Sequence, residues 1–213
     1  MHEYIKRLII LFKDPSNFAR NVARETGYWN VLKVFVIFYM SILIIRLLLS
    51  IGVTLRGGGI LSAELILSSL IAGLIAAFIV PFFWSGVTHL GVLIFGGRQG
   101  FFNTFKVATY SWILILIYGL VIPLIASVLL LIKPLGTIEV ITQLYTSVFG
   151  VAMLVVSLAG FVHVIIAETI GLSLLHKISR IRAFLSAILI PLILMVVFYG
   201  VVVWLLSITM GSL

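Results

Sequence analysis

The residues most able to do chemistry are three ionisable side chains inside long apolar stretches: His89, His163 and Glu168. Two imidazoles and a carboxylate could hold a divalent metal with an open coordination position, or could relay protons. The sequence also allows a structural role, in which the histidines bond to backbone carbonyls or to Thr88 and Ser85. His163 and Glu168 are separated by about 140° around a helix, so they do not share one face.

Two further charges, Arg46 and Glu64, lie in neighbouring apolar stretches that are joined by the glycine run 57–59. An unpaired charge at membrane depth is costly, and the short connection makes the two stretches neighbours. We therefore predict an ion pair between Arg46 and Glu64.

Sequence signatures of common enzyme classes are absent from the chain. It contains no Cys, which excludes thiolate nucleophiles and Cys-based metal sites. It also lacks the His-Glu-x-x-His spacing of zinc proteases, a phosphate-binding loop and a dinucleotide fingerprint. We predict a protein that is not an enzyme and has no cofactor, apart from the divalent metal considered above.

The elements that must position these residues are apolar helices. The chain is 63% hydrophobic and 9% charged, whereas soluble domains are about 45–50% apolar and 25% charged. We predict an all-α polytopic membrane domain over 30–213, with five transmembrane helices. The predicted spans are 31–55, 60–95, 107–132, 138–175 and 183–208. The second and fourth would each exceed about 50 Å as straight helices, so they must tilt, kink or project from the bilayer core of about 30 Å.

Residues 1–29 are predicted to form a cytoplasmic amphipathic segment of two short helices. Asp14 can cap a helix and Pro15 suits its first position, so the break between the two helices falls there. In the second helix Phe18 and Val22 oppose the basic residues. A basic amphipathic helix beside a span is expected to lie in the membrane interface.

Most of the 14 Lys and Arg residues lie in alternate gaps between the apolar stretches. The positive-inside rule places these gaps, and the N-terminus, in the cytoplasm and the C-terminus outside. The net charge of +8 is confined to segments beside the membrane, which favours anionic lipid headgroups over nucleic acid as the partner. The residues that we expect to meet headgroups are Lys6, Arg7, Lys13, Arg20, Arg24, Arg98, Lys106, Lys177, Arg180 and Arg182.

Small residues recur at helical spacing in the second and fourth apolar stretches. Ser69, Gly73 and Ala77 repeat every four positions, and Gly150 and Gly160 belong to a second stripe. Such stripes allow close helix packing inside a bundle or between protomers. The sequence is therefore compatible with a homo-oligomer.

Three groups of residues resemble the Yip family (Ypt-interacting proteins). The first comprises His89 and Leu90, Gly96 and Gly97, Phe101 or Phe102, Thr104 and Phe105, Val107, and Tyr110 and Ser111. The others are Gly171, Leu172, His176, Ser179 and Ala183, and the N-terminal Pro15 and Phe18. The resemblance implies a five-span membrane protein with a cytoplasmic N-terminus. It also implies membrane or GTPase partners, since eukaryotic relatives are linked to vesicle trafficking and Rab-type GTPases.

The short N-terminal region departs from the long hydrophilic one of eukaryotic relatives and is similar to compact prokaryotic members. We therefore predict a multi-pass protein of a prokaryotic plasma membrane. Its predicted function is to organise membrane or recruit partners through a basic cytoplasmic face. The alternative is a small metal-ion or proton transporter or channel that uses His89, His163 and Glu168.

Overall fold

The computed structural model describes residues 2–56, 62–132 and 148–211, and these residues are almost entirely helical. The helices are α1 (His2–Lys13), α2 (Pro15–Val22), α3 (Tyr28–Arg56), α4 (Ala63–Ile94), α5 (Phe101–Ile132), α7 (Val148–His176) and α8 (Arg180–Gly211). No strand occurs within those ranges, which confirms the predicted all-α fold.

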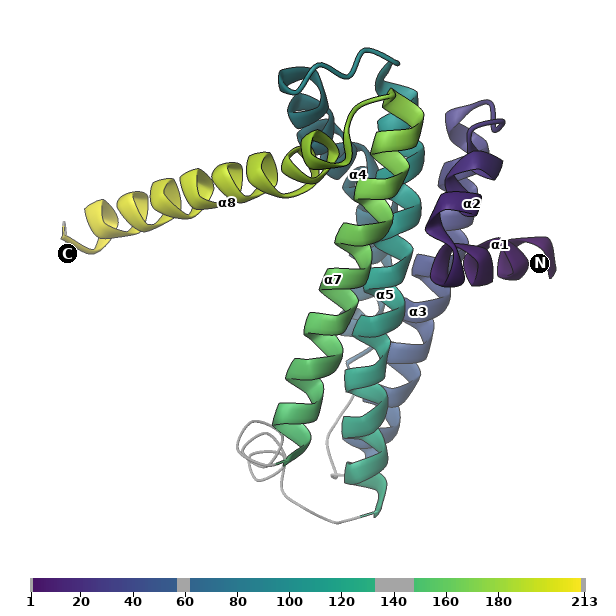
Figure 1. Cartoon of the computed structure of the whole chain (residues 1–213). Coiled ribbons are helices and arrows are strands. Elements are labelled where there is room, and N and C mark those ends of the chain that lie inside the picture. The colour runs from purple at the N-terminus through teal and green to yellow at the C-terminus, as the bar shows by residue number, and fades with distance from the viewer. Residues whose placement is uncertain (1, 57–61, 133–147, 212–213) are drawn as a thin grey trace.

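The N-terminal region forms two helices with the break at the predicted position. The carboxylate of Asp14 accepts a hydrogen bond from the backbone N–H of Asn17 at 3.0 Å, and Pro15 occupies the first turn of α2. A side-chain oxygen at this position satisfies one of the backbone donors that a helix start leaves unpaired. Phe18 and Val22, which oppose the basic residues of this helix, are buried within the protein. Helix α2 packs against α7. Helix α1 packs against α2, contacts Tyr118 of α5 and His163 of α7 through Phe12, and points away from the bundle towards its N-terminal end (Figure 1).

Among the described residues, five helices are long and apolar enough to cross a membrane: α3, α4, α5, α7 and α8. Their number agrees with the prediction, although their bounds differ. The third begins at Phe101, six residues before the predicted 107. The predicted turn 57–59 and the predicted start of the fourth span, 138–147, lie outside the described residues.

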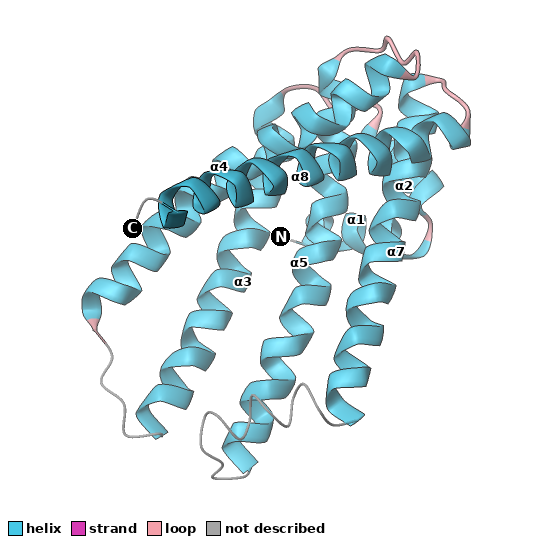
Figure 2. Ribbon diagram, turned by 90° about the vertical axis from the view of Figure 1, so that its left-hand side faces the viewer, coloured by secondary structure: helices cyan, strands magenta, loops and turns pink. Residues whose placement is uncertain are grey.

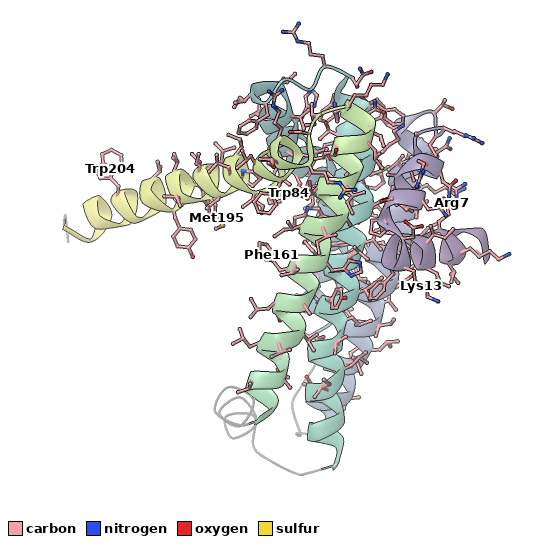
Figure 3. The ribbon with its side chains drawn as sticks, in the orientation of Figure 1. Arg7, Lys13, Trp84, Phe161, Met195 and Trp204 are labelled. Carbon is pink, nitrogen blue, oxygen red and sulfur yellow. The ribbon has the colours of Figure 1, made fainter. Side chains whose placement is uncertain are left out.

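Four of these helices, α3, α4, α5 and α7, run side by side as a bundle (Figure 2). Helix α5 is central, because it packs against α3, α4 and α7. The first part of α8 contacts α4 and α7, and the helix then turns away from the bundle (Figure 1). Met195 and Trp204 project from this outer part, where their exposed fractions are 57% and 61% (Figure 3).

Glycines set the closest approaches between the helices. A Cβ at Gly91 of α4 would lie 2.7 Å from the carbonyl oxygen of Ser186 in α8. A Cβ at Gly160 of α7 would lie 2.6 Å from the ring of Tyr118 in α5. Gly160 belongs to the second small-residue stripe, and a Cβ at Gly73 of the first would meet the Leu43 side chain in α3. Both stripes thus contribute to packing within the chain, where lipid supplies no hydrophobic drive between helices.

Helix α4 ends in a glycine turn that directs the chain into α5. Gly96 has φ +90°, a left-handed conformation that side chains with a Cβ rarely adopt. The N–H of Gly97 donates to the carbonyl of Val92 at 2.8 Å, which closes a Schellman motif. The Gly96-Gly97 pair is therefore explained by the geometry of the turn that ends α4.

Candidate functional site

The N-terminal helices are held on α5 by a polar contact around Glu25. The Tyr110 hydroxyl lies 3.1 Å from both carboxylate oxygens of Glu25, and Arg7 forms an ion pair with the same carboxylate. Phe18 of α2 packs edge-to-face on the Tyr110 ring, with the centroids 5.1 Å apart. Glu25 is only 12% exposed, so the hydrogen bond and the ion pair stabilise a charge that is largely removed from water.

Lys106 of α5 belongs to the same contact, although the sequence placed it among the residues facing lipid headgroups. Its side chain is buried and its Nζ donates to the carbonyl of Ala23 at 3.3 Å. The ammonium also lies 4.8 Å from the centroid of the Phe102 ring, a cation–π geometry. In this structure the buried Lys106 side chain contacts the segment after α2.

Eight of the ten predicted headgroup residues are exposed, and those of α2, of the segment just after it and of the two turns gather towards one end of the bundle. The eight exposed residues are Lys6, Lys13, Arg20, Arg24, Arg98, Lys177, Arg180 and Arg182. The α4–α5 turn and the α7–α8 turn lie at the same end, beside the end of α2 (Figure 1). Arg7 is partly exposed and engaged with Glu25. We call the exposed Arg20, Arg24, Arg98, Lys177, Arg180 and Arg182 the basic end of the molecule. Helix α1, with Lys6 and Lys13, lies part-way along the bundle (Figure 3).

Below the basic end, a hydroxyl joins two histidines across three helices. Thr104 Oγ1 of α5 lies 2.8 Å from His89 Nδ1 of α4 and 2.9 Å from His176 Nε2 of α7. A hydroxyl has one proton to donate and lone pairs that accept, so Thr104 can bond to both rings at once. Thr104 and His176 are buried, and the contact connects α4, α5 and α7.

Glu168 has a different partner. Its Oε1 accepts a hydrogen bond from the Thr88 hydroxyl at 3.2 Å, which links α7 to α4. The exposed fraction of Glu168 is 2% and that of Thr88 is 0%. A buried carboxylic group of this kind needs its hydrogen bond, because an unmet polar group in an apolar interior is costly.

His163 lies apart from both contacts. Its Nδ1 is 3.0 Å from the Tyr118 hydroxyl of α5, and its ring packs edge-to-face with Phe12 of α1 at 4.5 Å. The structure therefore gives His89, His163 and Glu168 three separate sets of partners. In the ranges that the structure describes, no group of three or more His, Asp and Glu side chains is placed to hold a metal ion.

Arg46 and Glu64 also have separate surroundings. The Arg46 guanidinium donates to the carbonyl oxygen of Gly119 in α5 at 2.6 Å. Glu64 is exposed in the first turn of α4. The predicted ion pair between them is not among the ion pairs of the described residues.

Sequence reasoning missed Glu25 and His176 as members of polar contacts. Glu25 offered one signal, as one of only 6 acidic residues in a basic chain. Tyr110 and Thr104 were noticed only within the motif that resembles the Yip family. Their hydrogen bonds could not be anticipated, because each joins residues that lie far apart in the sequence.

The fold defines a multi-pass integral membrane protein with a basic end and buried polar contacts between its helices. The family model for the Yip1 domain matches residues 9–206, so the chain belongs to the Yip1 domain family. This confirms the family that the three motif groups predicted. Neither the curated proteins nor the solved structures that were compared give a match.

Proposed function

We propose that this Yip1 domain protein is not an enzyme and organises membrane or recruits partners through the basic end. The observation that carries the proposal is the convergence of three separate basic segments. Helix α2 with the segment just after it, the α4–α5 turn and the α7–α8 turn all bring exposed cations to one end of the bundle. Each cation near an anionic membrane surface contributes about 1 kcal/mol of attraction.

The contact around Glu25 supports this proposal, because it fixes the N-terminal helices to the rigid bundle. With Tyr110 and Arg7 holding Glu25, the basic residues of α1 and α2 keep a set position relative to the two turns. A preorganised surface loses less conformational entropy on binding than a free tail does.

The rest of the proposal concerns cellular context. We propose that the protein lies in a prokaryotic plasma membrane. The positive-inside rule places the basic end in the cytoplasm. Recruitment of GTPase partners is proposed from family membership alone. The transporter alternative gains no support from the separate partners of His89, His163 and Glu168.

The experiment is a vesicle-binding assay with full-length protein in nanodiscs of neutral lipid. We expect the protein to co-float with vesicles that contain phosphatidylglycerol. This binding should weaken as added salt screens the charges. Replacing Arg20, Arg24, Arg98 and Lys177 together by Gln should lower the affinity by about tenfold or more.

The matched control keeps every charge and exchanges Lys for Arg, and Arg for Lys, at the same four positions. It should bind like the wild type, because long-range attraction depends on charge and not on the shape of the cation. Unchanged binding by the Gln variant would contradict the proposed role of the basic end.

A further inference from the structure

The N-terminal helices border a partly open cavity of about 270 Å³. Its lining residues are Arg7, Ile10, Phe18, Asn21, Val22 and Glu25. They come from α1, from α2 and from the segment just after α2. Figure 3 places Arg7 at the angle between the two helices. The volume lies near the lower limit of about 300 Å³ for small-molecule sites, so the cavity suits a headgroup-sized ligand.

The cavity presents both signs of charge beside an apolar wall. Arg7 and Glu25 form an ion pair, and their side chains are 40% and 12% exposed. The Tyr110 hydroxyl, 3.1 Å from each carboxylate oxygen, fixes the orientation of Glu25. Phe18 and Val22 are buried apolar residues, and the exposed Asn21 adds an amide. Such a site complements a ligand that carries a cation next to an anion and continues into an apolar tail.

We propose that this cavity binds the headgroup of a phospholipid with a primary amine beside its phosphate, of the phosphatidylethanolamine type. The inference rests on the proposed function, because it names a lipid that the N-terminal helices engage. The Asn21 amide donates to the phosphate, and the positive charge of Arg7 attracts it while Arg7 keeps its ion pair with Glu25. Glu25 accepts from the ammonium, because a carboxylate accepts about four hydrogen bonds and not only those from Tyr110 and Arg7.

The presence of Glu25 selects against other headgroups. An anionic headgroup without an amine would place its charge beside this carboxylate, and a serine headgroup would add a second carboxylate. A choline headgroup has no N–H to donate, and its three methyl groups enlarge the cation. The ethanolamine headgroup alone among these matches both charges with hydrogen bonds.

The test measures the thermal unfolding of full-length protein in detergent at high salt, which screens the basic end. The added probes are glycerophosphoethanolamine, glycerophosphocholine and inorganic phosphate. We expect only glycerophosphoethanolamine to raise the Tm of the wild type, because a ligand that binds the folded state stabilises it by mass action.

Two variants locate the effect. Glu25→Gln removes the carboxylate, and Asn21→Leu changes the exposed rim of the cavity without touching the ion pair. Both should lose the Tm rise. Asn17→Leu is the matched control, because Asn17 is exposed on the same helix and does not line the cavity. The Asn21 comparison remains decisive if Glu25→Gln loosens the N-terminal helices.

Equal Tm rises with glycerophosphocholine or inorganic phosphate would overturn the recognition of the amine. No rise with any probe, or a rise that Asn21→Leu retains, would overturn the site. Vesicle binding measured in parallel at low salt separates the two proposals. A protein that binds anionic vesicles but ignores glycerophosphoethanolamine retains the proposed function and loses only the headgroup site.

Discussion

At the residue scale, the N-terminal helices depend on a contact that spans distant parts of the chain. Glu25 is separated by 18 residues from Arg7 and by 85 from Tyr110, and both side chains meet its carboxylate. A hydrogen bond to a charged group contributes about 1.5–3 kcal/mol, more than one between neutral groups. Tyr110 is therefore the residue whose hydroxyl most directly couples the N-terminal segment to the bundle.

Tyr110→Phe should loosen this coupling while keeping the aromatic packing on Phe18. We expect a lower Tm and faster proteolysis between α2 and α3, with a loss of about 1.5–3 kcal/mol in the stability of the docked segment. Limited trypsin digestion of the detergent-solubilised protein measures the rate of cleavage between α2 and α3. Tyr199→Phe is the control, because Tyr199 is 68% exposed on the outer part of α8. Equal digestion of both variants would contradict the coupling role.

Thr104→Val should destabilise the bundle by about 1–3 kcal/mol, because it leaves His89 and His176 without their shared hydroxyl. Valine has nearly the shape of threonine, so packing changes little. Thr104→Ser restores the hydroxyl and should recover most of the loss. Thermal unfolding of the wild type and the two variants measures these changes in stability. A serine variant that is no more stable than the valine variant would indicate that packing, not hydrogen bonding, dominates at this position.

At the element scale, the helices approach closely where one of them has no side chain. Gly91 lies against the backbone of Ser186, so α4 and α8 touch at main-chain distance. Gly86 is on the same helix with no atom near the position of a Cβ. Substitution of Gly91 therefore tests the contact between the helices, and substitution of Gly86 tests intrinsic helix propensity alone.

Gly91→Ala should destabilise the α4–α8 contact by about 1–3 kcal/mol, because backbone atoms cannot yield as a flexible side chain can. Gly86→Ala should be neutral or slightly stabilising, since alanine is the better helix former. Thermal unfolding or tryptic release of α8 measures both. A Gly91 variant that unfolds like the Gly86 variant would show that α8 does not pack on α4 at this point.

At the scale of the whole molecule, the bundle places the α4–α5 turn and the α7–α8 turn at one end. The chain contains no Cys, so any introduced cysteine is the sole thiol. Arg98 and Lys177 are both exposed in these turns. Their shared location makes membrane sidedness a direct test of the arrangement.

Arg98→Cys and Lys177→Cys should react with a membrane-impermeant maleimide from the same side, which the proposed orientation makes the cytoplasmic one. Labelling intact cells and inverted vesicles distinguishes the two sides. Reaction from opposite sides would contradict the bundle, and reaction of both from outside would reverse only the proposed orientation.

The sequence by itself determined the number and type of the elements. Apolar length set the five long helices, the Asp14-Pro15 pair set the break between α1 and α2, and motif residues such as Gly96 and Gly97 indicated the family. These features depend on residues close together in the chain, where helix caps, periodicity and the hydrophobic span length act. The first and last residues of the helices were less predictable. Helix α5, for example, already begins at Phe101 and includes the polar residues Asn103 and Thr104 ahead of its apolar part.

Only the tertiary structure decided which side chains meet. Local pattern marked His89, His163 and Glu168 as unusual, but helix packing gave them Thr104, Tyr118 and Thr88 as partners. Helix packing likewise buries the Lys106 side chain, although its charge predicted a contact with a lipid headgroup. Helical periodicity fixes the face on which a residue lies, but not the neighbouring helix that the face meets. That choice depends on the shapes of all the helices together, including the glycines that permit close approach.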